Sequence, residues 1–170
     1  MFAYMEVGVL NAPSPDENRM AQVGWSLLMV AEMPRRSGDD RLPARVQSAC
    51  RESFYGHLRC LVAFLWWSDD DRDFNRHTFL RGWEMPDDSL SETLRGAQLM
   101  ASQQVAHFSE KRVDADLQVR VDPERLHEIA GELLDAFGLY VSALGGNESK
   151  YAPRFRALLD DANRERGAIA

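Results

Sequence analysis

Helix-start signals recur along this chain and constrain its fold more than any other feature. A capping box opens the first segment at 14–17, where Ser14 is the candidate N-cap and Pro15 follows at the first helical position. A second box spans 89–92, and the pair at 122–123 (Asp-Pro) begins another segment. Because such residues satisfy or tolerate the free N–H groups of a first helical turn, they favour helices over strands.

Apolar residues at helical spacing follow each of these start signals and predict helices. Residues that stop a helix mark several of the ends. The first helix should end before Pro34, because a proline inside a helix removes a hydrogen bond and clashes with the preceding turn. A glycine pair at 145–146 should end the helix that starts at 122. The full set of predicted helices is 14–33, about 43–67, 89 to about 109, 122–146 and about 153–166, with one short helix in the connection 68–88.

One stretch departs from the helical period. Val113, Ala115, Leu117, Val119 and Val121 alternate with polar residues, which is typical of a half-buried strand. The N-terminal segment 2–10 is its candidate partner. The fold class predicted is mainly α, a four- to five-helix bundle with a short β pair. At 170 residues, one helical domain over 1–170 is expected.

Composition excludes several locations and ligands. No apolar run approaches 18 residues, so no membrane-spanning helix is expected, and the N-terminus lacks the basic region of a signal peptide. Cys50 and Cys60 lie ten residues apart in one predicted helix, about 15 Å along its axis. That separation is too large for a disulfide, so both are expected to be buried thiols of a reducing cytoplasm.

Charge bears on the class of partner. The formal net charge is −7, which repels nucleic acid unless a local basic patch exists. Metal binding is not expected either. Only one Glu-x-x-His pair occurs, Glu124 with His127, whereas helical-bundle metal sites use two, and the phase of His127 predicts that it is solvated. The acidic run 69–73 lacks the glycine and terminal glutamate of a calcium loop. No cofactor is expected.

His57 is the first candidate site residue. It shares a helical stripe with apolar neighbours and should point into the bundle; the stripe is Val46, Cys50, Phe54, His57, Leu61 and Phe64. A histidine in such a place is most often structural and hydrogen-bonded to a serine, for which Ser53 is available. The functional alternative pairs it with Arg51, two turns earlier on the same helix.

His107 and Arg112 form the second candidate pair. His107 lies on the flank of the apolar stripe of its helix, where a neighbouring helix should come alongside. Arg112 would turn towards the core only if the helix continued that far, and it would then need a carboxylate such as Glu52. Otherwise Arg112 is a solvated residue at the helix end, where the helix dipole favours a cation. Both alternatives remain open.

Two motifs carry a family resemblance. The stretch 51–57, RESFYGH, resembles the Arg-x4–6-His motif of HEPN-type helical domains. The stretch 103–112, QQVAHFSEKR, is similar to a His-hydrophobe-Ser/Thr-x-x-Arg element of little-characterised bacterial helical proteins. The HEPN resemblance implies a dimer and metal-independent RNA cleavage, with Arg51, His57, His107 and Arg112 as candidate catalytic residues. In HEPN ribonucleases the motif lies late in the bundle, whereas here it falls in the second helix.

Two functions are consistent with these features. The first is a non-catalytic bacterial helical module that binds a protein partner or forms a homodimer, because the adjacent tryptophans Trp66 and Trp67 are too bulky to bury completely together. The alternative is a HEPN-like ribonuclease or toxin-type effector in microbial defence, and RNA is a partner only on that reading. Histidine would then activate the 2′-hydroxyl and arginine would hold the phosphate.

Overall fold

The structure is a computed structural model that describes residues 13–66, 74–85, 88–105 and 122–167. Within these ranges the chain is helical, with six helices and no strand. The predicted mainly α bundle is therefore confirmed for the described residues. The predicted β pair, 2–10 with 113–121, lies outside them.

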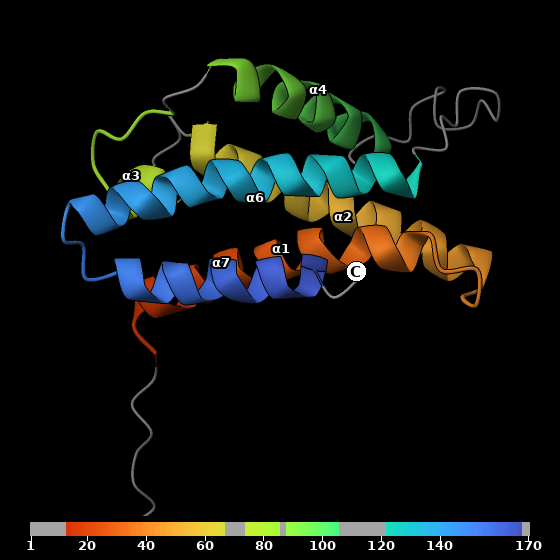
Figure 1. The fold of residues 1–170 in the computed structure, drawn as a ribbon, viewed down its shortest axis with the longest axis horizontal. Helices are drawn as coiled ribbons and strands as arrows, with labels where there is room; N and C mark the ends of the chain where they lie inside the picture. Colours follow the sequence, from red (N-terminus) through yellow and green to blue (C-terminus); the bar gives the residue numbers. More distant parts are fainter. Residues whose placement is uncertain (1–12, 67–73, 86–87, 106–121, 168–170) are drawn as a thin grey trace, which may run out of the picture.

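The helices are arranged in three layers (Figure 1). The lower layer holds α1 and α7, the middle layer holds α2 and α6, and α4 lies on top against α2 and α6. The single-turn helix α3 lies near the end of α2. Their bounds are α1 Pro15–Ser37, α2 Ala44–Trp66, α3 Arg76–Phe79, α4 Asp88–Val105, α6 Pro123–Gly146 and α7 Ala152–Gly167.

The predicted caps at two helix starts are confirmed. The Glu17 backbone N–H donates to the Ser14 hydroxyl at 3.3 Å, and the Ser14 N–H donates to the Glu17 carboxylate at 2.6 Å. Asp122 caps α6 by accepting the backbone N–H of Glu124 at 3.0 Å. These bonds satisfy N–H groups that have no partner inside the helix.

Two predicted boundaries are wrong. Pro34 does not end α1, which continues through it to Ser37. The turn after Pro34 is held because the Ser37 hydroxyl donates to the Pro34 carbonyl at 2.7 Å, and because Pro34 itself is buried. Packing thus offsets the roughly 3 kcal/mol cost of an interior proline. At the other boundary α4 begins at Asp88, so Ser89 lies inside the helix instead of capping it.

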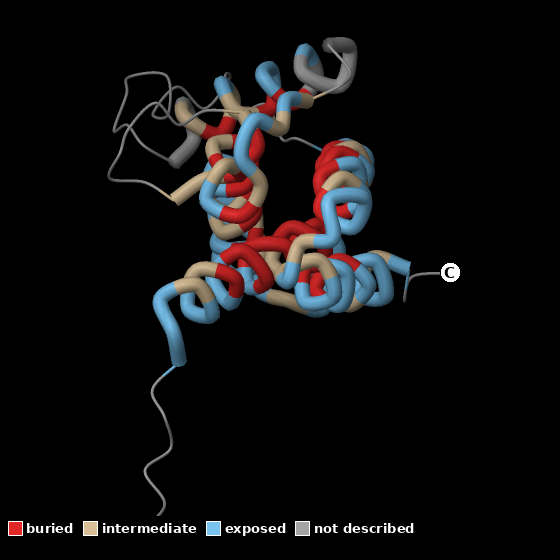
Figure 2. The backbone as a smooth tube through the Cα atoms, turned by 90° about the vertical axis from the view of Figure 1, so that its left-hand side faces the viewer, coloured by how far each residue is buried: buried red, intermediate tan, exposed pale blue. Residues whose placement is uncertain are grey.

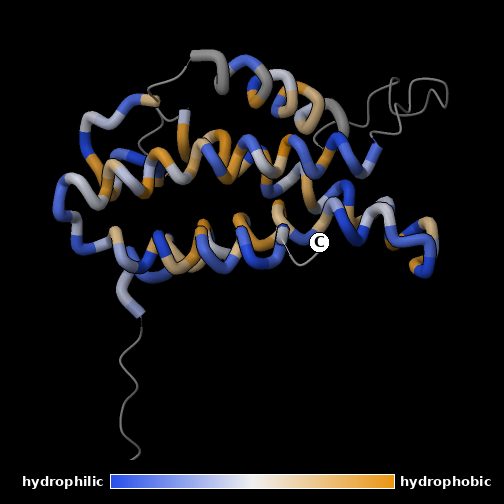
Figure 3. Tube along the Cα trace, viewed as in Figure 1, coloured by the Kyte–Doolittle hydropathy of each residue, from blue (hydrophilic) through white to orange (hydrophobic). Residues whose placement is uncertain are grey.

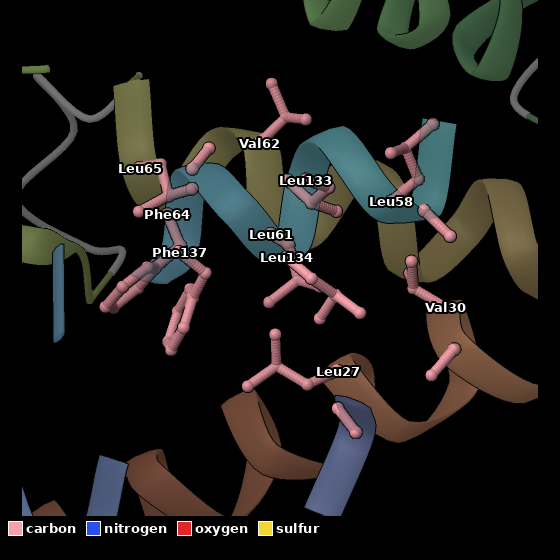
Figure 4. Packing of buried hydrophobic residues seen from close by; sticks show 14 of the residues in the cluster. Leu27, Val30, Leu58, Leu61, Val62, Phe64, Leu65, Leu133, Leu134 and Phe137 are labelled. Atoms are coloured by element: carbon pink, nitrogen blue, oxygen red, sulfur yellow. The ribbon is translucent and has the colours of Figure 1, made fainter. Parts of the chain in front are cut away.

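The core is centred on α6. This helix lies above α1 and α7 and below α4, so its buried face is wider than that of α7 (Figure 2). Figure 4 shows Leu133 and Leu134 of α6 directed towards Leu61 of α2, with Leu27 of α1 below them. Figure 3 shows the same contrast in hydropathy, since α6 carries more apolar positions than α7. Among the described helices, none combines the length and apolarity needed to cross a membrane.

Aromatic side chains fill one end of the bundle. The Phe64 ring contacts five others, with centroid separations of 5.5–6.5 Å; these are Phe74, Phe79, Phe137, Tyr140 and Phe155. Trp83 packs edge-on against Tyr140 at 5.1 Å. Trp66 is half-buried against this core, which is consistent with the expectation that the adjacent tryptophans are not both completely buried. Trp67 lies outside the described residues.

Candidate functional site

His57 lies at the seam between α1 and α2. Its Nδ1 atom is 3.1 Å from the hydroxyl oxygen of Ser26, which comes from α1. The predicted serine partner was Ser53 of the same helix, so the type of partner is confirmed and its identity is wrong. The helical phase of His57 predicts that it points into the bundle; the side chain faces α1 at this seam and is half-buried. Loss of water around the ring lowers the pKa of His57.

Trp25 borders His57 on the outer side of this seam. The two rings meet edge-on, with centroids 6.5 Å apart and an interplanar angle of 81°. Trp25 is nevertheless 56% exposed, a large value for an indole in the middle of a helix. Ser26, the next residue, is buried. Of these two adjacent residues of α1, Ser26 points inward and contacts His57 through its hydroxyl, whereas the indole of Trp25 points outward and is largely in solvent.

Arg51 binds the end of α1. Its Nη1 atom donates to the backbone carbonyl of Ser37 at 3.3 Å, and its Nη2 atom donates to the hydroxyl of Ser48 at 3.1 Å. The carbonyls of a last helical turn have no partner within the helix, so a guanidinium there supplies a missing donor. Through its bond to Ser37, Arg51 joins α2 to the end of α1.

The remaining candidates are His107 and Arg112. Both fall within 106–121, which the structure does not describe, so the predicted cluster of these residues with Glu52, Arg51 or His57 stays a prediction. The structure brings together His57 and Ser26, and it places Arg51 two turns from His57 on the same helix.

The Ser26–His57 pair has limited catalytic capacity. Ser26 lies in the middle of α1, where its backbone N–H belongs to the helical hydrogen-bond ladder. Serine nucleophiles need a base and also N–H donors aimed at the developing oxyanion. Within the described residues, the hydrogen bond of this pair is the one that joins the Ser26 hydroxyl to the His57 ring. This geometry is that of a partly buried polar contact between two helices.

One of the two cysteine thiols is placed differently from the prediction. Cys50 is buried, but Cys60 is exposed, so the prediction of two buried thiols is wrong for Cys60. Cys60 lies on the side of α2 opposite Leu58, which is fully buried, because two helical residues rotate the chain by about 200°. Within the described ranges, no group of three or more His, Cys, Asp or Glu side chains is arranged to hold a metal ion.

Arg76 is a buried charge that the sequence did not single out. It is 7% exposed, its Nε atom donates to the Trp83 carbonyl at 3.0 Å, and its Nη2 atom bonds the Glu84 carboxylate at 3.2 Å. Its own carbonyl accepts the Tyr140 hydroxyl at 2.9 Å. These contacts fasten the turn after α3 onto α6. No sequence pattern marks such a residue, because its partners, the Trp83 carbonyl and the Glu84 carboxylate, meet it only once the turn after α3 has formed.

The chain matches no protein-family model, no curated protein and no solved structure. Any functional proposal therefore rests on the residues of this chain.

Proposed function

We propose that this chain is a non-catalytic helical module that binds protein, and that its first partner is a second copy of itself. The observation that carries the proposal is Trp25, which is 56% exposed at the middle of α1. Tryptophan is enriched at protein interfaces and is often among the few residues that dominate binding energy. Leu28, which is half-buried, and Ala21, which is exposed, lie about one turn on either side of Trp25 and extend the apolar surface along α1.

Charge along α1 favours pairing of two copies across a two-fold axis. Glu17 lies in the first turn and Arg35 in the last, and both are exposed. They are 18 residues apart, which is five helical turns, so they share one flank of the helix with Leu28 and Ala21. If two α1 helices cross antiparallel near Trp25, Glu17 of one copy approaches Arg35 of the other. A two-fold interface uses the same surface on both subunits.

The structural partners of the candidate catalytic residues support a non-catalytic assignment. Arg51 is bonded to Ser37 and Ser48, and His57 is bonded to Ser26. Each side chain therefore has a role in holding α2 against α1 that accounts for its residue type.

The test is the oligomeric state as a function of concentration. Wild-type protein should self-associate in sedimentation equilibrium. Trp25→Ala should weaken association by about tenfold or more, since truncating a central interface tryptophan costs about 2 kcal/mol or more. Leu99→Ala is the matched control, because Leu99 is 64% exposed but lies on α4.

A charge reversal tests the two-fold arrangement. Arg35→Glu should weaken association by bringing like charges together at the partner's end of α1, whereas the same change at Arg154, exposed on α7, should not. A wild-type chain that stays monomeric up to about 100 µM, a weak-affinity limit, would contradict self-association. Equal effects of the two reversals would contradict the α1 interface.

A second candidate, HEPN-like metal-independent RNA cleavage, has one specific observation in its favour. Burial lowers the pKa of His57, which favours the neutral imidazole, and the ring is only half-buried. A neutral imidazole is the form that acts as a general base. Purified protein that cleaves single-stranded RNA in the presence of a chelator, with activity lost in His57→Gln, would replace the non-catalytic assignment.

A further inference from the structure

A titratable ring lies at the edge of the exposed indole of Trp25. The His57 and Trp25 rings meet edge-on with centroids 6.5 Å apart, and Nδ1 of His57 is 3.1 Å from the Ser26 hydroxyl oxygen. His57 is half-buried and Trp25 is 56% exposed, so both rings keep part of their surface in water. A partner that covers Trp25 would therefore also remove water from His57.

Protonation changes what the His57 ring needs from its surroundings. A neutral imidazole has one N–H donor and one acceptor nitrogen, whereas the charged ring has two N–H donors. The Ser26 hydroxyl can bond Nδ1 in either state, because a hydroxyl both donates and accepts. The second N–H of the charged ring depends on water. Under a partner this N–H and the positive charge would lose that water, which is costly when no acceptor replaces it.

The charged residues of α1 do not offset this cost. Arg19 lies seven residues before Ser26 and pairs with Asp16, and Glu32 lies six residues after it and pairs with Arg36. Each of these pairs is formed within α1. The pKa of His57 is lowered by burial, and no charged neighbour among the described residues contributes to that lowering.

The charged residues of α2 face other directions or have other partners. Glu52 precedes His57 by five residues and Arg59 follows it by two, which places them about 140° and 160° around the helix from it. Arg51 is bonded to the end of α1. Cys60, one turn after His57, is an exposed thiol. In the described parts of α1 and α2, no carboxylate is therefore placed to stabilise a charged His57 ring.

We propose that His57 is a proton switch for the α1 surface, so that protonation of its ring weakens self-association through Trp25. This inference rests on the self-association proposed above and names its regulation. The structural basis is the ring contact between Trp25 and His57, which places a titratable group at the rim of the proposed interface.

Thermodynamic linkage gives the direction of the effect. Burial already lowers the pKa of His57 from the usual value of about 6.5, and a covering partner would lower it further. A group with a lower pKa in the complex releases its proton on association. Association is therefore strongest above the pKa of His57 in the free chain and weakens as the pH falls through it, by at most about tenfold per pH unit.

Sedimentation equilibrium at about pH 7.5 and about pH 5.5 tests the switch, since an exposed histidine titrates between these values. The dissociation constant of the wild-type protein should rise by about three- to tenfold at the lower pH. In His57→Gln it should not depend on pH, because glutamine does not titrate but can still bond Ser26. Glu17 stays charged over this window, because bonds to Ser14 lower its pKa.

His127→Gln is the matched control. His127 is half-buried on α6 and not solvated as its phase predicts, and burial lowers its pKa as it does that of His57. It belongs to α6 and not to the α1 surface, so His127→Gln should keep the pH dependence of the wild-type protein. NMR titration of the His57 ring gives a reciprocal measurement, because its pKa should be lower in concentrated than in dilute protein.

Each contrary outcome has a distinct meaning. A wild-type protein that is monomeric at both pH values would contradict self-association and the switch together. Association that is lost in Trp25→Ala but equally strong at both pH values would leave the α1 surface standing and overturn the switch. A pH dependence that persists in His57→Gln, or that His127→Gln abolishes to the same extent, would assign it to other groups and also overturn the switch.

Discussion

Two buried tyrosines differ in what their hydroxyl groups contact. Tyr140 is fully buried and donates to the Arg76 carbonyl at 2.9 Å. Tyr55 is 4% exposed, and its hydroxyl is buried without a hydrogen-bond partner among the described residues. Burial raises the pKa of Tyr55 to about 12. A buried hydroxyl without a partner costs free energy, whereas a bonded one is roughly compensated.

Replacing each tyrosine by phenylalanine should therefore change the free energy of unfolding in opposite directions. Tyr55→Phe should raise the free energy of unfolding by about 1 kcal/mol, because it removes an uncompensated polar group. Tyr140→Phe should lower it by about 1–2 kcal/mol, because it leaves the Arg76 carbonyl without its donor. Denaturant melts of both variants measure the difference. A larger loss in Tyr55→Phe than in Tyr140→Phe would mean that Tyr55 has a partner in solution.

At the scale of the helix, glycines in α1 and α2 have different surroundings. A Cβ atom at Gly56 of α2 would meet nothing within 4 Å. At Gly24 of α1 it would lie 2.5 Å from the Cδ2 atom of Leu158, which belongs to α7. Gly24 therefore permits the close approach of α1 and α7, whereas Gly56 weakens its helix without a packing benefit.

Alanine at these two positions should separate helix propensity from packing. Gly56→Ala should stabilise the protein by about 0.5–1 kcal/mol through lower backbone entropy in the unfolded chain. At Gly24 the same gain is opposed by about 1–3 kcal/mol of overpacking against Leu158, so Gly24→Ala should be destabilising. Thermal unfolding of the two variants checks this. A stabilised Gly24→Ala protein would show that α7 shifts at little cost.

At the scale of the whole molecule, two half-buried histidines make stability depend on pH near neutrality. The pKa values of His57 and His127 are both lowered in the folded state, mainly because burial penalises the charged ring. The unfolded chain therefore takes up protons first as the pH falls through about 6.5, the value of an exposed histidine. Stability should be fully present above that pH and should decline below it.

Urea melts between pH 5 and pH 8 test this dependence. The free energy of unfolding should fall towards pH 5, and His57→Gln should flatten the fall by removing one of the two groups. Asp39 does not obscure the window, since its pKa is lowered to about 2 by Arg41 and its effect appears only at stronger acidity. Stability that is constant or rises towards pH 5 would contradict the burial of both rings.

Local chemistry was enough to predict the helices and several of their ends. Ser14 and Asp122 act as caps through bonds to residues two or three positions away, so short sequence windows contain both partners. Helical phase also predicted most of the α2 core face, including Phe54, Leu61 and Phe64. Val46, in the first turn of that helix, is exposed despite its phase.

Tertiary packing decided what local rules leave open. Pro34 stays inside α1 because it is itself buried, and His57 contacts Ser26 across a helix pair instead of Ser53 along its own helix. The approach of Arg166 to Gly131 joins residues 35 positions apart. The sequence by itself determined where helices begin and which faces are apolar, because those properties depend on neighbours within a few turns. Only the fold decided which polar groups meet, since their partners come from other helices.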